Sequence, residues 1–231
     1  MKFKALLHYF TKFELILWVT SVTVILGSSL LFGAESYLSV IASLLGTTAL
    51  ILVAKGNPLG QLLMIVFSVL YGIISFSAAY YGEMITYLFM SAPMNAFSLI
   101  SWLKNPYKGN KSQVKINHLK KRDVIVMVLI TIPVTIALYF ILATLGTRNL
   151  IPSTISVLTS FIAVYLTFKR SVYFSVAYAA NDIILIILWL MMLPTGTSYV
   201  SVVICFVIFL FNDLYTFFNW LRMRKKQDSN I

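Results

Sequence analysis

Eight apolar runs follow one another along this chain, with only short polar segments between them. A helix needs about 20 mostly apolar residues to cross the hydrocarbon core of a bilayer. The runs cover residues 14–32, 37–54, 58–80, 84–103, 123–145, 151–168, 172–193 and 198–221. Charged residues make up 11% of the chain, against about 25% in soluble domains. The sequence therefore predicts an all-α integral membrane protein with eight transmembrane helices, forming a single membrane domain over residues 1–231.

The basic residues follow the alternation of the segments between the runs. If the chain starts on the cytoplasmic side, every Lys and Arg except Arg148 falls in a cytoplasmic segment, whereas the outer loops contain Glu35 and Glu83. Positive charge concentrates on the cytoplasmic side of membrane proteins. The pattern therefore predicts a multi-pass protein of the cell membrane with both termini in the cytoplasm. The net charge of +11 then reflects topology, and no nucleic-acid binding is predicted.

Three segments lie outside the apolar runs. Residues 1–13 place apolar side chains on one helical face and lysines elsewhere, which predicts an interfacial helix. Residues 104–122 are polar and basic, and we expect them to form a cytoplasmic loop on the anionic membrane surface. Residues 222–231 are predicted to be a cytoplasmic tail.

The second to fourth spans resemble the sixth to eighth spans. Lys55 follows the second span as Lys169 follows the sixth, and Asn95-x6-Trp102 near the end of the fourth matches Asp213-x6-Trp220 in the eighth. One span separates the units, so both would start in the same direction and form a parallel repeat. The predicted order is a first span at 14–32, a three-helix bundle at 37–103, a linker span at 123–145 and a second three-helix bundle at 151–221.

Polar side chains recur at helical spacing inside several of the runs. Polar groups in the bilayer core are costly and tend to face the interior of a bundle. Ser and Thr in these stripes are better explained as contacts between helices. The rarer amide and acidic groups, with the aromatic residues on the same faces, are the candidate site residues: Gln61, Tyr71, Asn95, Tyr178, Asn181, Asp182, Trp189, Asn212 and Asp213.

Asp182 and Asp213 have no basic residue at a comparable depth in the runs. Three interpretations stay open: a buried neutral acid, a carboxylate that faces water or a cationic ligand, and a proton carrier. The neighbouring aromatic residues favour a flat ligand, and a cation would gain further from them. An aspartic protease would need the two carboxyl groups about 3 Å apart, and nothing in the sequence predicts that they meet.

Other catalytic and cofactor motifs do not occur in the sequence. It contains no P-loop, no H-E-x-x-H zinc motif and no G-x-S-x-G elbow. Cys205 is the only cysteine, and no Cys or His cluster offers a metal site. The G-x-x-x-G segment at Gly56–Gly60 contains Pro58 and gives little support for helix dimerisation. We therefore expect no enzyme activity, no cofactor and no metal.

Three stretches resemble the PnuC family of nicotinamide riboside transporters over roughly residues 35–225. They are Tyr178-Ala-Ala-Asn181-Asp182 with Trp189, Asn212-Asp213-Leu-Tyr215 with Trp220, and Pro93-Met-Asn95 with Trp102. The resemblance implies a fold similar to that of SWEET transporters, with two three-helix bundles and a linker helix, assembled as a homotrimer. It also implies import of nicotinamide riboside by facilitated diffusion with alternating access, followed by trapping through a cytoplasmic kinase that phosphorylates it.

The same resemblance implies where the substrate binds. The site would lie between the bundles at Asn181, Asp182, Asn212 and Asp213, with Gln61, Tyr71 and Asn95 contributed by the first half. Tyr178 stands near the position where family members often carry Trp, so the stacking partner differs here. Carriers of thiamine, riboflavin or a deoxynucleoside on the same fold remain alternatives, as do an intramembrane enzyme and a non-transporting receptor.

Overall fold

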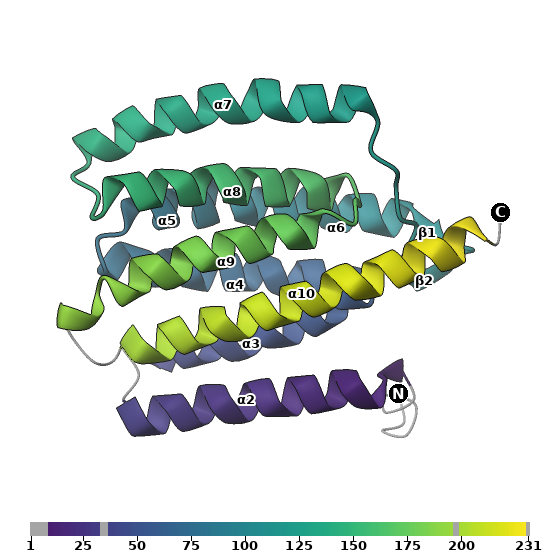
Figure 1. Cartoon of the computed structure of the whole chain (residues 1–231), viewed down its shortest axis with the longest axis horizontal. Coiled ribbons are helices and arrows are strands. Elements are labelled where there is room, and N and C mark those ends of the chain that lie inside the picture. The colour runs from purple at the N-terminus through teal and green to yellow at the C-terminus, as the bar shows by residue number, and fades with distance from the viewer. Residues whose placement is uncertain (1–8, 33–36, 196–198, 230–231) are drawn as a thin grey trace.

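The computed structural model describes residues 9–32, 37–195 and 199–229, and long helices form almost all of this part of the chain (Figure 1). The helices are α2 (Lys12–Phe32), α3 (Tyr37–Ala54), α4 (Pro58–Ser77), α5 (Tyr81–Ile85), the π-helical η1 (Thr86–Ser91), α6 (Ala92–Lys104), α7 (Lys121–Thr144), α8 (Leu150–Phe168), α9 (Phe174–Leu190), the short η2 (Leu193–Thr195) and α10 (Val200–Asp228). Two short strands, β1 (Pro106–Tyr107) and β2 (Asn110–Val114), separate α6 from α7. The predicted all-α class is confirmed.

Seven helical segments of the described chain are long and apolar enough to cross a membrane. One of them combines α5, η1 and α6 into a single run over Tyr81–Lys104, and the others are α2, α3, α4, α7, α8 and α10. The apolar helix α9 is shorter, with 17 residues. The chain is therefore a multi-pass membrane protein, whereas the count of eight spans depends on α9 and stays a prediction.

The helices lie side by side and alternate in direction, with α2 on one flank of the bundle and α7 on the opposite flank (Figure 1). Helix α4 packs against α3 and α6, helix α9 packs against α8 and α10, and the two groups meet where α3 contacts α10 and α6 contacts α8. The β-hairpin, the end of α10 and the turns α3–α4 and α8–α9 lie at one end of the bundle, which we call the hairpin end; the opposite end is the far end.

The turns α3–α4 and α8–α9 have the same local construction. Gly56 and Arg170, each one residue after the matched lysines, both have positive φ angles, of 68° and 56°. The next residue then accepts a hydrogen bond from the backbone N–H two positions later, Asn57 from Leu59 and Ser171 from Tyr173. Such side-chain acceptors satisfy N–H groups that the first turn of a helix leaves free.

The predicted loop at 104–122 contains an antiparallel hairpin, β1–β2, which was not expected from the sequence. After the hairpin, the chain is fixed to both turns, because Val114 N–H donates to Gly56 O (2.9 Å) and Asn117 N–H donates to Arg170 O (3.0 Å). The buried side chain of Gln227 accepts from Ile116 N–H (2.8 Å) and donates to Val114 O (3.1 Å). The segment therefore links both halves of the bundle to the end of α10.

Replacing Gln227 with alanine is expected to destabilise this end of the protein by about 1–3 kcal/mol, because it leaves a buried N–H and a buried C=O without partners. Thermal unfolding of the purified protein in detergent measures the effect. Gln227→Glu keeps one acceptor for Ile116 and loses the donor, so we expect a smaller loss of stability. Equal stability of Gln227→Ala and the unmodified protein would contradict this account of the hairpin.

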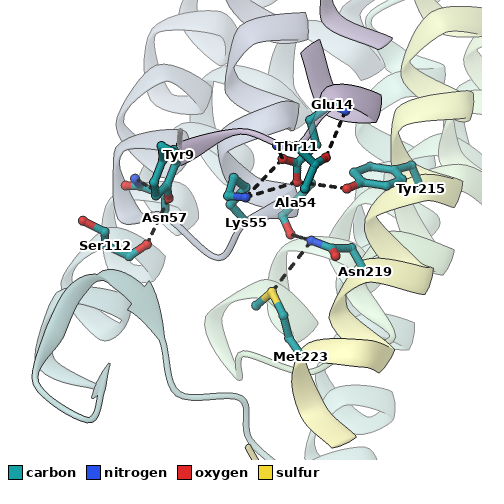
Figure 2. A network of polar contacts seen from close by, with 10 residues as sticks. All are labelled: Tyr9, Thr11, Glu14, Ala54, Lys55, Asn57, Ser112, Tyr215, Asn219 and Met223. Carbon is teal, nitrogen blue, oxygen red and sulfur yellow. Dashed lines mark hydrogen bonds and ion pairs between the residues drawn. The ribbon is translucent and has the colours of Figure 1, made fainter. Parts of the chain in front are cut away.

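Helix α2 is joined to the bundle by a buried acidic residue at its first turn (Figure 2). Thr11 and Glu14 cap the helix reciprocally: Thr11 N–H donates to Glu14 Oε2 (2.7 Å), and Glu14 N–H donates to Thr11 Oγ1 (3.2 Å). The same carboxylate pairs with Lys55 (3.1 Å), at the end of α3, and accepts from the Tyr215 hydroxyl (2.9 Å) on α10. Most of the predicted interfacial helix at 1–13 lies outside the described residues.

Helix α7 is joined to α8 by a pair at matching positions. Asp123, in the first turn of α7, pairs with Lys169 at 2.7 Å, and this hydrogen bond raises the pKa of Lys169 above its usual value. Lys55 and Lys169 are the two lysines that the sequence comparison matched, and each bonds an acid at the start of the preceding long helix. Helix α2 is therefore attached to α3 as α7 is attached to α8.

Candidate functional site

A small internal cavity lies between the two groups of helices, near the middle of their length. Its lining comes from α3, α4, η1, α6, α9 and α10: Leu50, Met64, Phe67, Ser68, Tyr87, Ser91, Asn95, Tyr178, Asp182, Phe209 and Asp213. The space open to the centre of a water-sized sphere is about 20 Å³. That suffices for one or two water molecules and is far too small for an aromatic ligand. The protein is thus closed around this site.

Two polar pairs of matching position face the cavity. Asn95 Nδ2 donates to Ser68 Oγ (3.3 Å) in the first half. Asp182 and Asp213, at the corresponding positions of the second half, are in direct contact through their carboxyl groups. Nothing in the sequence predicted that these acids meet, and the packing of α9 on α10 brings them together. The cavity therefore has one neutral pair and one acidic pair.

Several oxygen atoms of these pairs are buried without a hydrogen-bond partner among the described residues. They are Asn95 Oδ1, Asp182 Oδ2 and Asp213 Oδ1. Buried polar atoms in proteins are nearly always paired with protein groups, water or ligands. The side chains that line the cavity include no Lys, Arg or His. The site is therefore rich in free acceptors and suits a ligand that donates hydrogen bonds or carries positive charge.

Tyr87 is a lining residue that the sequence analysis missed, and the π-helical turn explains why. Ala92 N–H bonds Tyr87 O, five residues back, directly before Pro93, which has no N–H. In an uninterrupted α-helix, residues eight apart point about 80° away from each other. The wide turn absorbs one residue, so Tyr87 and Asn95 reach the same cavity. Regular helical spacing could not predict this alignment.

The other lining residues that were missed are the apolar Leu50, Met64, Phe67 and Phe209, together with Ser68 and Ser91, which had been assigned with the other Ser and Thr residues to contacts between helices. Phe67 stacks on Tyr71 with ring centroids 5.7 Å apart, and it contacts Tyr87 (6.0 Å) and Phe209 (5.3 Å). Such residues are common on every face of a membrane helix, so the sequence carries no signal that separates them from lipid-facing ones. Tyr178, which was predicted from its polar stripe, does line the cavity.

Asn181 and Asn212 are not among the residues that line the cavity. The Asn181 Oδ1 atom accepts from Ser156 (3.1 Å), Thr159 (2.8 Å) and Ser160 (3.0 Å), which fixes α9 to α8. Asn212 Nδ2 donates to Ile208 O (2.8 Å) and lies 3.5 Å from Ser21 Oγ of α2. Gln61 is buried on α4 and does not reach the cavity lining either.

Glu83 was predicted to lie in an outer loop, and the structure corrects this. It belongs to α5 and is fully buried. The neighbouring Gly82 explains the burial, because a side chain there would stand 3.0 Å from Ser153 Cβ of α8 and 3.2 Å from Leu142 Cδ1 of α7. Both Glu83 carboxyl oxygens are buried without a hydrogen-bond partner among the described residues, since the nearby Ser156 hydroxyl donates to Asn181 (3.1 Å). Helix α5 therefore adds a buried acid to the bundle, besides Glu14, Asp182 and Asp213.

The cavity is closed at the hairpin end by two tryptophans at matching positions. Trp102 Nε1 donates to Thr167 O (3.1 Å), and Trp220 Nε1 donates to Val53 O (2.9 Å). Each bond therefore crosses from one half of the chain to the other. In each case the acceptor carbonyl belongs to the residue two positions before a matched lysine. The two rings lie 5.3 Å apart, and both side chains are fully buried. The residue before each tryptophan makes a similar bond to the following carbonyl: Ser101 donates to Phe168 O, and Asn219 donates to Ala54 O.

The far end is closed by Tyr71, Tyr80 and Trp189. Trp189 Nε1 donates to the Tyr71 hydroxyl (2.7 Å), and Tyr80 OH donates to Leu188 O (2.6 Å). The Tyr80 and Trp189 rings meet edge to face at 5.3 Å. These contacts also join the first half of the chain to the second. Two of the predicted site residues, Tyr71 and Trp189, therefore close the far end and do not line the cavity.

Replacing Tyr80 with phenylalanine is expected to cost about 1–3 kcal/mol, because the fully buried hydroxyl donates to Leu188 O and also accepts from Asn149 Nδ2 (3.1 Å). Tyr81→Phe is the matched control, since no hydrogen bond of the Tyr81 hydroxyl is recorded in the described structure. The measurement compares the thermal unfolding midpoints of the two purified variants. Equal midpoints for Tyr80→Phe and Tyr81→Phe would refute a structural role for the Tyr80 hydroxyl.

A sequence profile described as "Nicotinamide mononucleotide transporter" matches residues 36–222. The chain belongs to this family, the PnuC transporters. The "Nicotinamide riboside transporter PnuC" of Neisseria mucosa is 24% identical over 220 residues, which cover 94% of this chain and 83% of that protein. A crystal structure described as that of the vitamin B3 transporter PnuC superposes with a TM-score of 0.82 at 22% identity and covers 94% of both chains.

Membership of the PnuC family decides between the broad alternatives left by the sequence. The family consists of transporters, so the contact between Asp182 and Asp213 belongs to a transport protein and not to an intramembrane protease. The superposition supports the arrangement of the helices over nearly the whole length of the PnuC fold.

Proposed function

We propose that this protein imports nicotinamide riboside across the cell membrane through the cavity between its two helix groups. The observation that supports this most strongly is the cavity itself, which has unpaired acceptors, aromatic walls and closures at both ends that connect the two halves. A carrier needs such a site, closed on both sides in an intermediate state. The Neisseria mucosa relative carries the corresponding name.

The proposed architecture has two three-helix bundles, 37–103 and 151–221, related as a parallel repeat similar to that of SWEET transporters, with α7 as the linker and α2 as an additional span. The paired contacts of Trp102 and Trp220 and of the two matched lysines support this relation. In this proposal α9 also crosses the membrane, which gives eight spans, and the hairpin end with both termini faces the cytoplasm. Assembly as a homotrimer is part of the same proposal.

Transport would proceed by alternating access. Opening the hairpin end would separate Trp102 from Thr167 and Trp220 from Val53, whereas opening the far end would separate Tyr80 from Leu188. We propose that Tyr178, Asp182, Asp213 and Asn95 contact the substrate. Tyr71 and Trp189 would close the far end over it, and Asn181, Asn212 and Gln61 would hold the surrounding helices in place.

The energy source in this proposal is the substrate gradient alone. Nicotinamide riboside would move by facilitated diffusion, and a cytoplasmic kinase would phosphorylate it and prevent its return. Uptake of labelled nicotinamide riboside into vesicles that contain the purified protein tests this directly. We expect equilibration without ATP or an imposed ion gradient, and accumulation only when a nicotinamide riboside kinase and ATP are enclosed. Accumulation above the outside concentration without the kinase would contradict facilitated diffusion.

Thiamine is the second candidate substrate, because its thiazolium ring is also a cation that the acidic pair would accommodate. Riboflavin and deoxynucleosides are neutral and make less use of two carboxyl groups. The candidate substrates can be ranked by how strongly each unlabelled compound inhibits the uptake of labelled nicotinamide riboside. Stronger inhibition by thiamine than by unlabelled nicotinamide riboside would identify thiamine as the preferred substrate. The proposed fold and transport cycle would then stay unchanged.

A further inference from the structure

A second cleft lies at the hairpin end, apart from the central cavity. The space open to the centre of a water-sized sphere is about 290 Å³, against about 20 Å³ in the central cavity. This is close to the volume of the smaller ligand sites of proteins. The proposed substrate contacts all lie in the central cavity and leave this cleft without a function. The residues that line this hairpin-end cleft are Tyr9, Lys55, Asn110, Ser112, Gln113, Asn219 and Met223 (Figure 2).

The lining offers hydrogen-bond donors that have no acceptor recorded in the described part of the chain. Asn110 uses only its side-chain oxygen, which accepts from Ser112 N–H (3.0 Å), and its amide N–H groups stay free, as do those of Gln113. The Lys55 ammonium bonds the Glu14 carboxylate (3.1 Å), which leaves at least one of its three N–H groups for a further acceptor. The cleft therefore suits a ligand with several acceptor oxygens.

The charges around the hairpin-end cleft favour an anion. Glu14 neutralises much of the charge of Lys55, but Lys111 lies in β2 between two lining residues, and Arg222 lies one helical turn from Asn219 on α10. Lys111 and Arg222 have no ion-pair partner among the described residues. A phosphate group combines negative charge with three strong acceptor oxygens, and lysine is a common phosphate ligand.

The other acidic residues described at the hairpin end do not line the cleft. Asp123 pairs with Lys169 at 2.7 Å. Asp228, at the exposed end of α10, pairs with His118 at 3.0 Å. Neither carboxylate therefore stands inside the cleft to repel a bound anion.

The hairpin-end cleft forms where the two halves of the chain meet. Lys55 follows α3 of the first half, whereas Asn219 belongs to α10 of the second half. Asn219 Nδ2 donates to Ala54 O (2.8 Å), next to the bond from Trp220 to Val53 O that closes this end. Opening the hairpin end would move α3 and α10 apart and take the cleft apart with them. A ligand that binds only the closed arrangement stabilises that arrangement.

We propose that the hairpin-end cleft binds a small phosphate-bearing molecule, and that the bound molecule holds this end closed and slows transport. In the proposed orientation the cleft takes its ligand from the cytoplasm, where the proposed kinase forms a phosphate ester. The effect on transport rests on the proposed function, whereas the binding of phosphate does not depend on it.

Thermal unfolding of the purified protein in a neutral detergent tests the binding, with ribose 5-phosphate as the ligand and ribose as the uncharged control. We expect ribose 5-phosphate to raise the unfolding midpoint as its concentration increases, and ribose to leave the midpoint unchanged. The effect should weaken as the salt concentration rises, because salt screens exposed charges. Equal midpoints with ribose 5-phosphate and with ribose would overturn the proposal.

Two variants locate the bound phosphate. Gln113→Glu and Asn110→Asp each place a carboxylate in the cleft with almost no change of size. We expect each to weaken the binding of ribose 5-phosphate by about tenfold or more, since like charges repel at close range. Asn117→Asp is the matched control, because it makes the same change in the same segment outside the lining. Unchanged affinity in both cleft variants, or an equal loss in all three variants, would overturn the assignment to the cleft.

Uptake of labelled nicotinamide riboside into vesicles of neutral lipid tests the effect on transport, with ribose 5-phosphate present on both sides. We expect a lower maximal rate that excess nicotinamide riboside does not restore. Gln113→Glu should need more ribose 5-phosphate for the same fractional inhibition. Binding of ribose 5-phosphate without inhibition would overturn the proposed closure. Absence of uptake under every condition would refute the proposed function and leave the binding result standing.

Vesicles that contain phosphatidylglycerol distinguish a soluble phosphate ester from a lipid headgroup. We expect ribose 5-phosphate to inhibit equally in neutral and anionic vesicles, which identifies a soluble ester as the ligand. Slower uptake in anionic vesicles, with no further inhibition by ribose 5-phosphate and with normal rates in Gln113→Glu, would identify the lipid phosphate as the occupant of the same cleft. Uptake that neither compound slows would overturn the proposal.

Discussion

The variant Trp220→Ala is expected to unfold with a free energy about 3–5 kcal/mol lower than that of the unmodified protein. The side chain is fully buried and contacts the rings of Trp102 (5.3 Å) and Phe174 (4.7 Å). Its loss leaves a cavity that backbone packing cannot close, and it also removes the hydrogen bond to Val53 O. Thermal unfolding in detergent, followed by size-exclusion chromatography, measures the loss.

Trp220→Phe keeps a large aromatic ring at this position but removes the indole N–H donor and part of the ring volume. We expect it to cost less than Trp220→Ala, about 1–3 kcal/mol. Trp102→Ala should resemble Trp220→Ala, since Trp102 makes the matching bond to Thr167 in the other half. A large loss for one tryptophan and none for the other would contradict the proposal that both form one closure at the hairpin end.

Gly60→Ala is the second substitution for which we expect a large effect, a loss of about 3 kcal/mol. A Cβ atom at Gly60 would stand 2.7 Å from Val53 N, 2.7 Å from Val53 Cγ2 and 3.0 Å from Ala49 O. Two of these neighbours are backbone atoms of α3, so α3 and α4 would have to move apart. Both helices line the cavity, through Leu50 on α3 and Met64 on α4. Substrate uptake should therefore fall with stability.

Gly27→Ala is the control for this substitution. Gly27 lies within α2, and nothing stands within 4 Å of the Cβ that alanine would add there. Alanine is favoured over glycine in a helix by about 1 kcal/mol, so we expect unchanged or slightly higher stability. A drop in melting temperature for Gly27→Ala as large as that for Gly60→Ala would show that the close approach of α3 and α4 does not decide the result.

The sequence predicted the helices well because lipid imposes a single strong requirement on them. A run of about 20 apolar residues has few alternatives to a helix in a bilayer. The predicted limits 37–54 agree with those of α3, and 14–32 and 151–168 agree with α2 and α8 to within two residues. The hairpin was missed because β1 and β2 are short, and tertiary contacts to Gly56 and Gln227 stabilise them.

The site was harder to predict than the helices, since residues in different helices had to be placed relative to one another. Helical spacing found Tyr178, Asp182, Asp213 and Asn95, all of which line the cavity. It could not show that Asn181 bonds three hydroxyl groups of α8 or that Asn212 faces α2. Polar residues that hold helices together and those that face a ligand follow the same periodicity.

The most direct test of the account is ligand-dependent thermal stabilisation of the purified protein, with nicotinamide riboside, thiamine, riboflavin and a deoxynucleoside compared at equal concentration. A ligand at 100 times its dissociation constant adds about 2.7 kcal/mol to the stability of the folded state. We predict stabilisation by nicotinamide riboside that is greatly reduced in Asn95→Ala and unchanged in Asp228→Asn. Stabilisation that Asn95→Ala leaves intact, or no stabilisation by nicotinamide riboside at all, would contradict the claim that this cavity binds it.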